Sequence, residues 1–240
     1  MAKTLTDKRE MILKGSIFKA ITSLALPLMV ANLAQTMYNL ADAYWVSNKI
    51  GYQAFAAIGY VWPITFIFLA FSIGLSIAAT SLISQSVGTG DYTKANRLAG
   101  QFFILSMAFG IVFAIAGSSL TPMIIKLMGA KGLLYTYSVQ YLQIVFWELP
   151  LLFAYHVYKS IHESQGDTVA PTILLFISVG LNIILDPLFI VGFGLGVRGA
   201  ALATVLSRFL IAGYLFKKMF DKNAVIHISK EYLKPDPVSY

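Results

Sequence analysis

The sequence has no cysteine and few charged residues. Without cysteine the chain cannot form disulfides, zinc–thiolate sites or iron–sulfur clusters. Charged residues make up 12% of the chain, against about 25% in an average soluble domain, and 58% of its residues are hydrophobic. The mean hydropathy is +0.72. A soluble fold of 240 residues could not bury so much apolar surface, so we expect the chain to lie in lipid.

The apolar residues form six runs, each long enough to cross a bilayer as a helix, which takes about 20 residues. Breaks with loop chemistry separate them, as at 88–91 and 192–196. We predict an all-α integral membrane protein: a six-helix bundle over residues 17–220, between an N-terminal segment (1–16) and a tail (221–240). The six runs are 17–46, 55–85, 98–120, 133–158, 169–192 and 197–220.

Lysine and arginine gather in the N-terminal segment, in the loops after the second and fourth runs, and in the tail. Cytoplasmic loops carry such an excess, so both termini are expected on the cytoplasmic side of a cell (plasma or inner) membrane. The net charge of +7 then lies against anionic lipid headgroups, and no nucleic-acid partner is predicted. The basic N-terminus is followed by an apolar stretch too long for a secretory signal peptide.

Three acidic residues fall inside predicted spans: Asp42, Glu148 and Asp186. A carboxyl group inside a bilayer is costly, so it normally faces the bundle interior and has a function. Burial favours its protonated form, which lets it exchange a proton for another cation. Two of these acids end polar stripes at helical spacing. The stripes are Asn32, Gln35, Asn39 and Asp42 on the first helix, and Ser178, Asn182 and Asp186 on the fifth.

The stripe on the fifth helix offers oxygen ligands for a hard cation such as Na⁺. Pro187 has no amide proton, so the carbonyl of Ile183 loses its helical donor. At about 1.5 Å per residue, Asp42 lies roughly 6 Å and Asp186 roughly 9 Å below the outer ends of their helices. Tyr141 and Thr204 fall about 10–12 Å below theirs, at a similar level. The alternative is that these stripes only form hydrogen bonds between helices.

Glu148 and Pro27 each leave more than one interpretation. Glu148, near the middle of the fourth run, is either a second proton site or a partner of Arg208 or of the backbone near Pro150. Pro27 produces either a static kink or a hinge in the first helix. His156 is expected at the membrane interface and not as a metal ligand.

Six short motifs follow one another along nearly the whole chain: LALP (24–27), YNLAD (38–42), AIG (57–59), SQSVGTGD (84–91), GDTVAP (166–171) and LNIILDP (181–187). In order and spacing they resemble the multidrug and toxic compound extrusion (MATE) family, and most closely its DinF-like branch. Each motif alone is weak, whereas the ordered set is specific.

The resemblance implies an antiporter that exports amphipathic, often cationic, drugs or metabolites in exchange for H⁺ or Na⁺. It implies no catalytic residue and no cofactor besides the coupling ion. By motif, the cation or proton site would comprise Asp42, Asn182, Asp186 and Thr204, all possible Na⁺ ligands, with Tyr141 nearby. The substrate cleft or hinge would include Pro27, Gln35, Asn39 and Glu148.

The chain departs from the family in two ways. Family members are about twice as long and have two six-helix lobes, and residues 234–237 resemble the linker between the lobes. The expected partners are therefore a C-terminal lobe or a second copy of the chain, together with membrane lipid and a small organic substrate. The second departure is Glu148, because the family usually has glycine two residues before the proline at 150.

Three functions other than antiport are alternatives for this sequence. A flippase of a related exporter superfamily would tend to carry more basic residues in its cavity. The motif at 88–91 matches the GxGD pattern of intramembrane aspartyl proteases, but it falls in a loop, so the sequence does not predict an enzyme. A lone lobe would otherwise be a binding protein that transports nothing.

Overall fold

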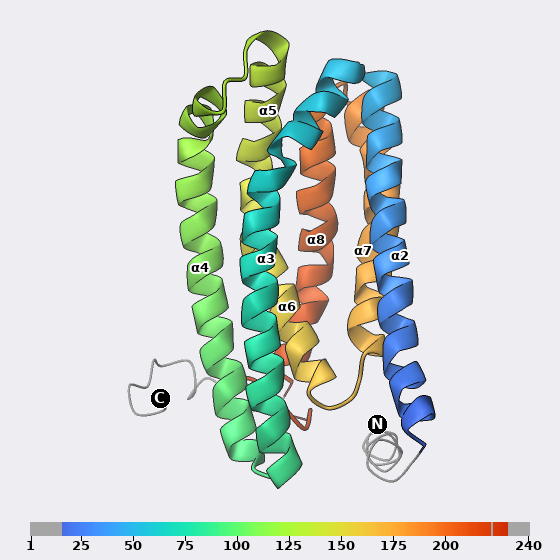
Figure 1. Ribbon diagram of the computed structural model, residues 1–240, viewed down its shortest axis with the longest axis vertical. Helices are drawn as coiled ribbons and strands as arrows, with labels where there is room; N and C mark the ends of the chain where they lie inside the picture. The colour runs from blue at the N-terminus through green and yellow to red at the C-terminus, as the bar shows by residue number, and fades with distance from the viewer. Residues whose placement is uncertain (1–15, 222, 230–240) are drawn as a thin grey trace.

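The computed structural model describes residues 16–221 and 223–229; the remaining parts of the predicted N-terminal segment and tail lie outside the described residues. Within that range six helical segments run side by side, and no strand occurs (Figure 1). The predicted all-α six-helix bundle is confirmed. The segments are α2 (Ile17–Lys49), α3 (Tyr52–Thr89), α4 (Tyr92–Leu127), α5 (Gly132–Val145) continued by α6 (Leu149–Glu163), α7 (Val169–Pro187) and α8 (Val197–Met219).

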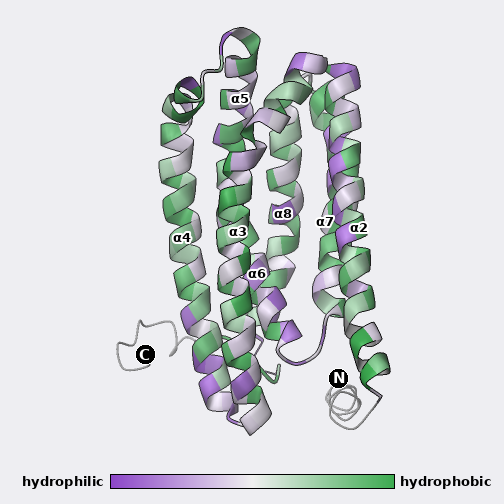
Figure 2. Cartoon of the chain, in the orientation of Figure 1, coloured by the Kyte–Doolittle hydropathy of each residue, from purple (hydrophilic) through white to green (hydrophobic). Residues whose placement is uncertain are grey.

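The bundle is apolar over most of its length (Figure 2). Among the described residues, four helices are long and apolar enough to cross a membrane: α3, α4, α8, and α7 with the turn that follows it. Helices α5 and α6 have 14 and 15 residues, fewer than a crossing requires, but they join end to end into one segment. The chain is thus a multi-pass membrane protein.

The fourth apolar run is not one uninterrupted helix as the sequence predicted. A 3₁₀ turn, Phe146–Glu148, separates α5 from α6. In an α-helix the amide of residue 150 would donate to the carbonyl of Phe146, but Pro150 has no amide proton. That carbonyl accepts instead from the amide of Leu149, which tightens the turn. The turn places Phe146 and Glu148 in the bundle interior.

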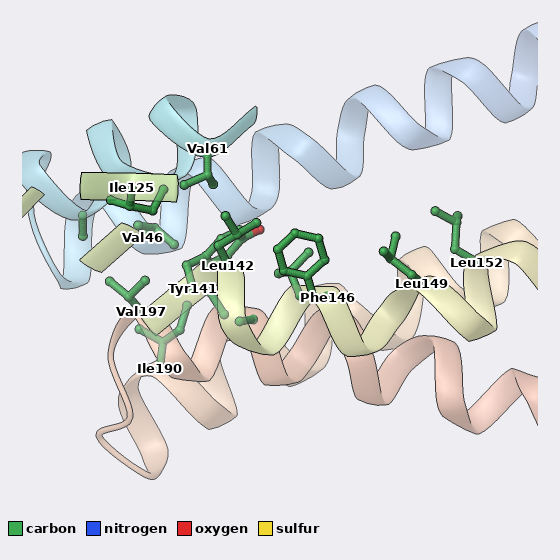
Figure 3. Close-up of a cluster of buried hydrophobic side chains, with 14 of the residues drawn as sticks. Val46, Val61, Ile125, Tyr141, Leu142, Phe146, Leu149, Leu152, Ile190 and Val197 are labelled. Atoms are coloured by element: carbon green, nitrogen blue, oxygen red, sulfur yellow. The ribbon is translucent and has the colours of Figure 1, made fainter. Parts of the chain in front are cut away.

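Two clusters of buried side chains form the core. The first lies toward the end of the bundle where α2 ends and α8 begins, and it includes Val61, Ile125, Leu142 and Phe146 (Figures 1 and 3). The second lies toward the opposite end and joins α3, α4, α6 and α8. Because lipid is as apolar as these side chains, close packing and not water exclusion holds the helices together.

The described part of the tail packs against the bundle. Ile226 and Ile228 are both buried in the second cluster. The amide of Ile228 donates to the carbonyl of Met219 over 2.7 Å, and the amide of His227 donates to Asn96 Oδ1 over 3.0 Å. Residues 223–229 are therefore held on the ends of α4 and α8.

Replacing Gly110 of α4 with alanine is expected to lower the Tm of the purified protein. A Cβ at this position would lie 2.8 Å from Pro150 Cα, so α4 and α6 would have to separate. Overpacking of this kind costs about 1–3 kcal/mol. The Gly74→Ala variant is the matched control, since a Cβ there has nothing within 4 Å. Equal melting temperatures for the two variants in detergent would contradict the close contact.

Candidate functional site

Asn182 and Asp186 lie one turn apart on α7, and both are fully buried. The Asn182 side-chain amide donates to Asp186 Oδ1 over 3.3 Å. Two further oxygen atoms, Asn182 Oδ1 and Asp186 Oδ2, are buried without a hydrogen-bond partner. An unpartnered buried polar atom is costly, so these two oxygens are suited to a ligand that the protein itself does not supply.

Asp42 lies on α2, which packs along α7. Its side chain is buried, and its Oδ1 atom also has no partner. The carboxyl groups of Asp42 and Asp186 lie within electrostatic range of each other. Two ionised carboxylates so placed repel one another unless a cation or a proton lies with them.

Tyr38 links the acidic site to α8. Its hydroxyl lies 2.8 Å from Thr204 Oγ1, and the two groups share a hydrogen bond. Tyr141 of α5 is buried and belongs to the first core cluster (Figure 3). It lies within electrostatic range of Asp42 and Asp186. The structure thus brings together all five residues of the predicted cation site, from four helical segments.

A wide turn follows Asp186 and fixes the end of α7 against α8. Pro187 ends the helix, and the next residues, Leu188–Gly192, form a π turn. Its backbone comes so close to α8 that a Cβ at Gly199 would lie 2.7 Å from the carbonyl oxygen of Phe189. π turns are frequent at functional sites because they displace the helix locally. Here the turn fixes the position of Asp186 relative to α8, the helix that carries Thr204.

The chemistry of the site favours a hard cation or a proton. Among the described residues there is no group of three or more His, Cys, Asp or Glu side chains that could hold a metal ion. The unpartnered atoms are carboxylate and amide oxygens, from Asp42, Asn182 and Asp186. Such oxygens match a hard, oxygen-preferring ion.

Glu148 forms an ion pair with Arg208. The distance from Arg208 Nε to Glu148 Oε1 is 2.6 Å, and the two side chains are only 12% and 11% exposed. Of the interpretations that the sequence left open, the structure shows the pairing with Arg208. Both charges lie within electrostatic range of Tyr38, so the ion pair adjoins the acidic site.

Of the residues predicted to line a cleft or form a hinge, Pro27, Gln35 and Asn39 lie on α2, and Glu148 lies on the 3₁₀ turn. Asn39 is exposed and accepts a hydrogen bond of 3.5 Å from the Gln35 amide. The polar stripe thus runs along the surface of α2, and Asp42 at its end is buried. Pro27 lies inside α2, and its carbonyl accepts a 3.5 Å hydrogen bond from Thr172 of α7.

Sequence reasoning missed one residue of the site. Tyr38 was not selected, although it lies four residues before Asp42 and therefore on the same helix face. His156 lies outside this site, and its side chain is buried between helices and is 8% exposed. Its expected position at the membrane interface stays a prediction.

Comparison with known proteins identifies similar chains of about twice the length. Residues 27–188 match the MatE family model. The chain is 30% identical to the probable multidrug resistance protein YoeA of Bacillus subtilis (strain 168), over 93% of this chain and 50% of YoeA. It is also 30% identical to the multidrug export protein MepA of Staphylococcus haemolyticus (strain JCSC1435), over 92% of this chain and 49% of MepA. The chain therefore spans about half the length of the curated relatives it matches.

The fold is similar to half of a solved transporter. It matches a MOP superfamily transporter from Pyrococcus furiosus with a TM-score of 0.87 and 31% sequence identity, over 95% of this chain and 50% of the other. The family model covers more than half of the chain, and the fold and the relatives agree with it. The chain belongs to the MatE family, and its six-helix bundle is equivalent to one lobe of a MATE transporter.

Proposed function

We propose that the protein works in a secondary active antiporter that exports amphipathic, often cationic, drugs or metabolites in exchange for H⁺ or Na⁺. The observation that carries the proposal is the pair of buried carboxyl groups on adjacent helices, Asp42 and Asp186, each with an oxygen that has no partner. The multidrug export and resistance proteins among its relatives support the substrate class. Since those relatives are twice as long, the working unit is proposed to contain a second lobe or a second copy of the chain.

In the proposed mechanism the two acids hold a cation and the cationic substrate in turn. When ionised, Asp42 and Asp186 attract the substrate; entry of H⁺ or Na⁺ neutralises them and releases it. Bending of α2 at Pro27 would move Asp42 relative to α7, because the proline ring interrupts the helical hydrogen bonds there. The membrane potential contributes about 2.3 kcal/mol per charge per 100 mV.

The proposed orientation follows from the basic residues near the ends of the bundle. Lys94 and Lys159 lie toward the end at which α3 stops and α4 begins, where α2 also begins and α8 ends (Figure 1). An excess of Lys and Arg favours the cytoplasmic side. Both termini would then be cytoplasmic and the protein would lie in the cell membrane.

The experiment that tests the function is efflux of a fluorescent organic cation from proteoliposomes that contain this chain. An imposed pH or Na⁺ gradient is expected to drive efflux in the unaltered protein, and an Asp186→Asn variant is expected to remove it. Dye binding that H⁺ or Na⁺ displaces, without efflux, would show that the bundle keeps the ion site and needs a partner lobe. Dye that neither binds nor moves under either gradient would contradict the proposal.

Replacing Tyr38 with phenylalanine is expected to raise the H⁺ or Na⁺ concentration needed to displace the bound dye by about 2- to 10-fold. The change removes the hydroxyl that bonds to Thr204, and one hydrogen bond contributes about 0.5–1.5 kcal/mol. The measurement is the H⁺ or Na⁺ concentration that displaces half of the bound dye. Tyr44→Phe is the matched control, since Tyr44 lies on the same helix and is 60% exposed. Equal shifts in the two variants would mean that the Tyr38 hydroxyl has no part in the site.

A further inference from the structure

A cavity lies between α3 and α6, away from the acidic site. Its volume is about 320 Å³, at the lower end of the range of small-molecule sites. Thr80 lies about 14 Å from the end of α3 and His156 about 10 Å from the end of α6. These helix ends lie at the end of the bundle where α2 begins and α8 ends (Figure 1). The lining residues are Ile73, Ser76, Ile77, Thr80, Ser81, His156, Lys159 and Glu163.

The inner wall of this cavity holds two polar atoms without partners. The hydroxyls of Ser76 and Ser160 lie 2.8 Å apart, and both donate to the carbonyl oxygen of His156, so the serines are satisfied. His156 Nδ1 and Thr80 Oγ1 are buried and have no hydrogen-bond partner. Since such atoms are normally satisfied, they mark a place where a polar ligand group can bind.

The rest of the lining combines opposite charges with an apolar wall. Lys159 Nζ and Glu163 Oε1 lie 3.6 Å apart, with side chains 31% and 18% exposed. The pair is long, is spaced i,i+4 on one helix and is partly buried. Helix pairs at this spacing contribute only about 0.3–0.5 kcal/mol, so either partner can bind a ligand instead at little loss of stability. Ile73 and Ile77 of α3 are exposed on the other side of the cavity.

We propose that this cavity binds a zwitterionic amphiphile, a molecule with an ammonium group close to a phosphate or carboxylate and with an apolar body. The anionic group would accept hydrogen bonds from Lys159 and Thr80, and the ammonium group would donate to Glu163. The apolar body would lie along Ile73 and Ile77. A simple cation would meet the charge of Lys159 and a simple anion that of Glu163, so a ligand that carries both charges fits best. The inference does not depend on the transport function.

Native mass spectrometry of the purified chain tests the proposal with three probes. Dioctanoyl phosphatidylethanolamine and 2-aminododecanoic acid are zwitterions, one from lipid and one a free amphiphile, and dioctanoyl phosphatidylglycerol is a simple anion. The protein is expected to bind either or both zwitterions about tenfold more tightly than the anion, the effect of one charge-assisted hydrogen bond. The tighter of the two zwitterions identifies the source of the ligand.

Three variants decide whether binding occurs in this cavity. Glu163→Gln is expected to abolish the preference for zwitterions over the anion, and Thr80→Val to weaken both zwitterions about 5- to 10-fold. Thr65→Val is the matched control, because Thr65 lies on the same helix outside the cavity and bonds to the carbonyl of Trp62. Equal affinity for all three probes in the unaltered protein, or equal binding by the two threonine variants, would overturn the proposal.

Discussion

Replacing Asp186 with asparagine is expected to abolish cation-driven efflux of an organic cation and to weaken cation binding by about 10- to 100-fold. The side chain is fully buried, and the variant keeps its shape but loses the charge. A hydrogen bond or contact to a charged group contributes about 1.5–3 kcal/mol, which gives this range. The measurement is the H⁺ or Na⁺ concentration at half-maximal dye displacement, with efflux measured in parallel. Asp42→Asn is expected to act similarly, and the two effects should not add, because both groups serve one ion.

Asp91→Asn provides the matched control for this experiment. Asp91 is exposed and caps α4 by accepting a hydrogen bond from the amide of Lys94, a role that asparagine also fills. Its substitution is expected to leave dye displacement unchanged. If Asp186→Asn folds normally and behaves like Asp91→Asn, the buried acid is not part of the coupling site.

The sequence predicted the six helical segments because each one is a long apolar run ended by glycine or polar residues. Gly90, for example, ends α3 in the left-handed conformation (φ 80°), which glycine adopts without strain. The division of the fourth run was missed. Pro150 carried the signal, but a proline in a membrane helix can be accommodated in several ways, and the neighbouring helices decide among them.

The burial of the two acids in the candidate site could be predicted from the cost of a charge in lipid. Asp42 and Asp186 had to face the interior of the bundle, and both are buried. The exposure of Asn39 could not be predicted in this way: Asn39 shares a stripe with Asp42, yet it is exposed. Spacing defines a helix face, but contacts between distant segments decide how much of that face is covered.

The partner of Glu148 was also beyond the sequence. Arg208 is 60 positions further along the chain, and only the packing of the 3₁₀ turn against α8 brings the two charges together. A hydrophobicity pattern identifies both residues as costly without showing that each offsets the cost of the other. The sequence therefore left open a proton site and an ion pair, and the geometry shows the pair.

Replacing Glu148 with glutamine is expected to destabilise the bundle by about 3–5 kcal/mol, because Arg208 would keep its charge in the interior without a counter-charge. Arg208→Met should lower the free energy of unfolding by a similar amount, because the Glu148 carboxylate would then be buried without a counter-charge. The double variant, Glu148→Gln with Arg208→Met, removes both charges and should recover most of the lost stability. The measurement is unfolding by denaturant in detergent, arranged as a double-mutant cycle.

The partly buried pair of Lys159 and Glu163, spaced i,i+4 on α6, gives the reference for this cycle. Its atoms lie 3.6 Å apart on one helix surface, where an ion pair contributes about 0.3–0.5 kcal/mol. A coupling energy between Glu148 and Arg208 no larger than this would contradict a buried, charge-compensated pair. If the double variant folds, measuring its affinity for the cation shows whether the ion pair also affects the acidic site, apart from its effect on stability. Both charges act on Tyr38, which bonds to Thr204, so an altered affinity in a stable protein would show that the pair tunes the acidic site.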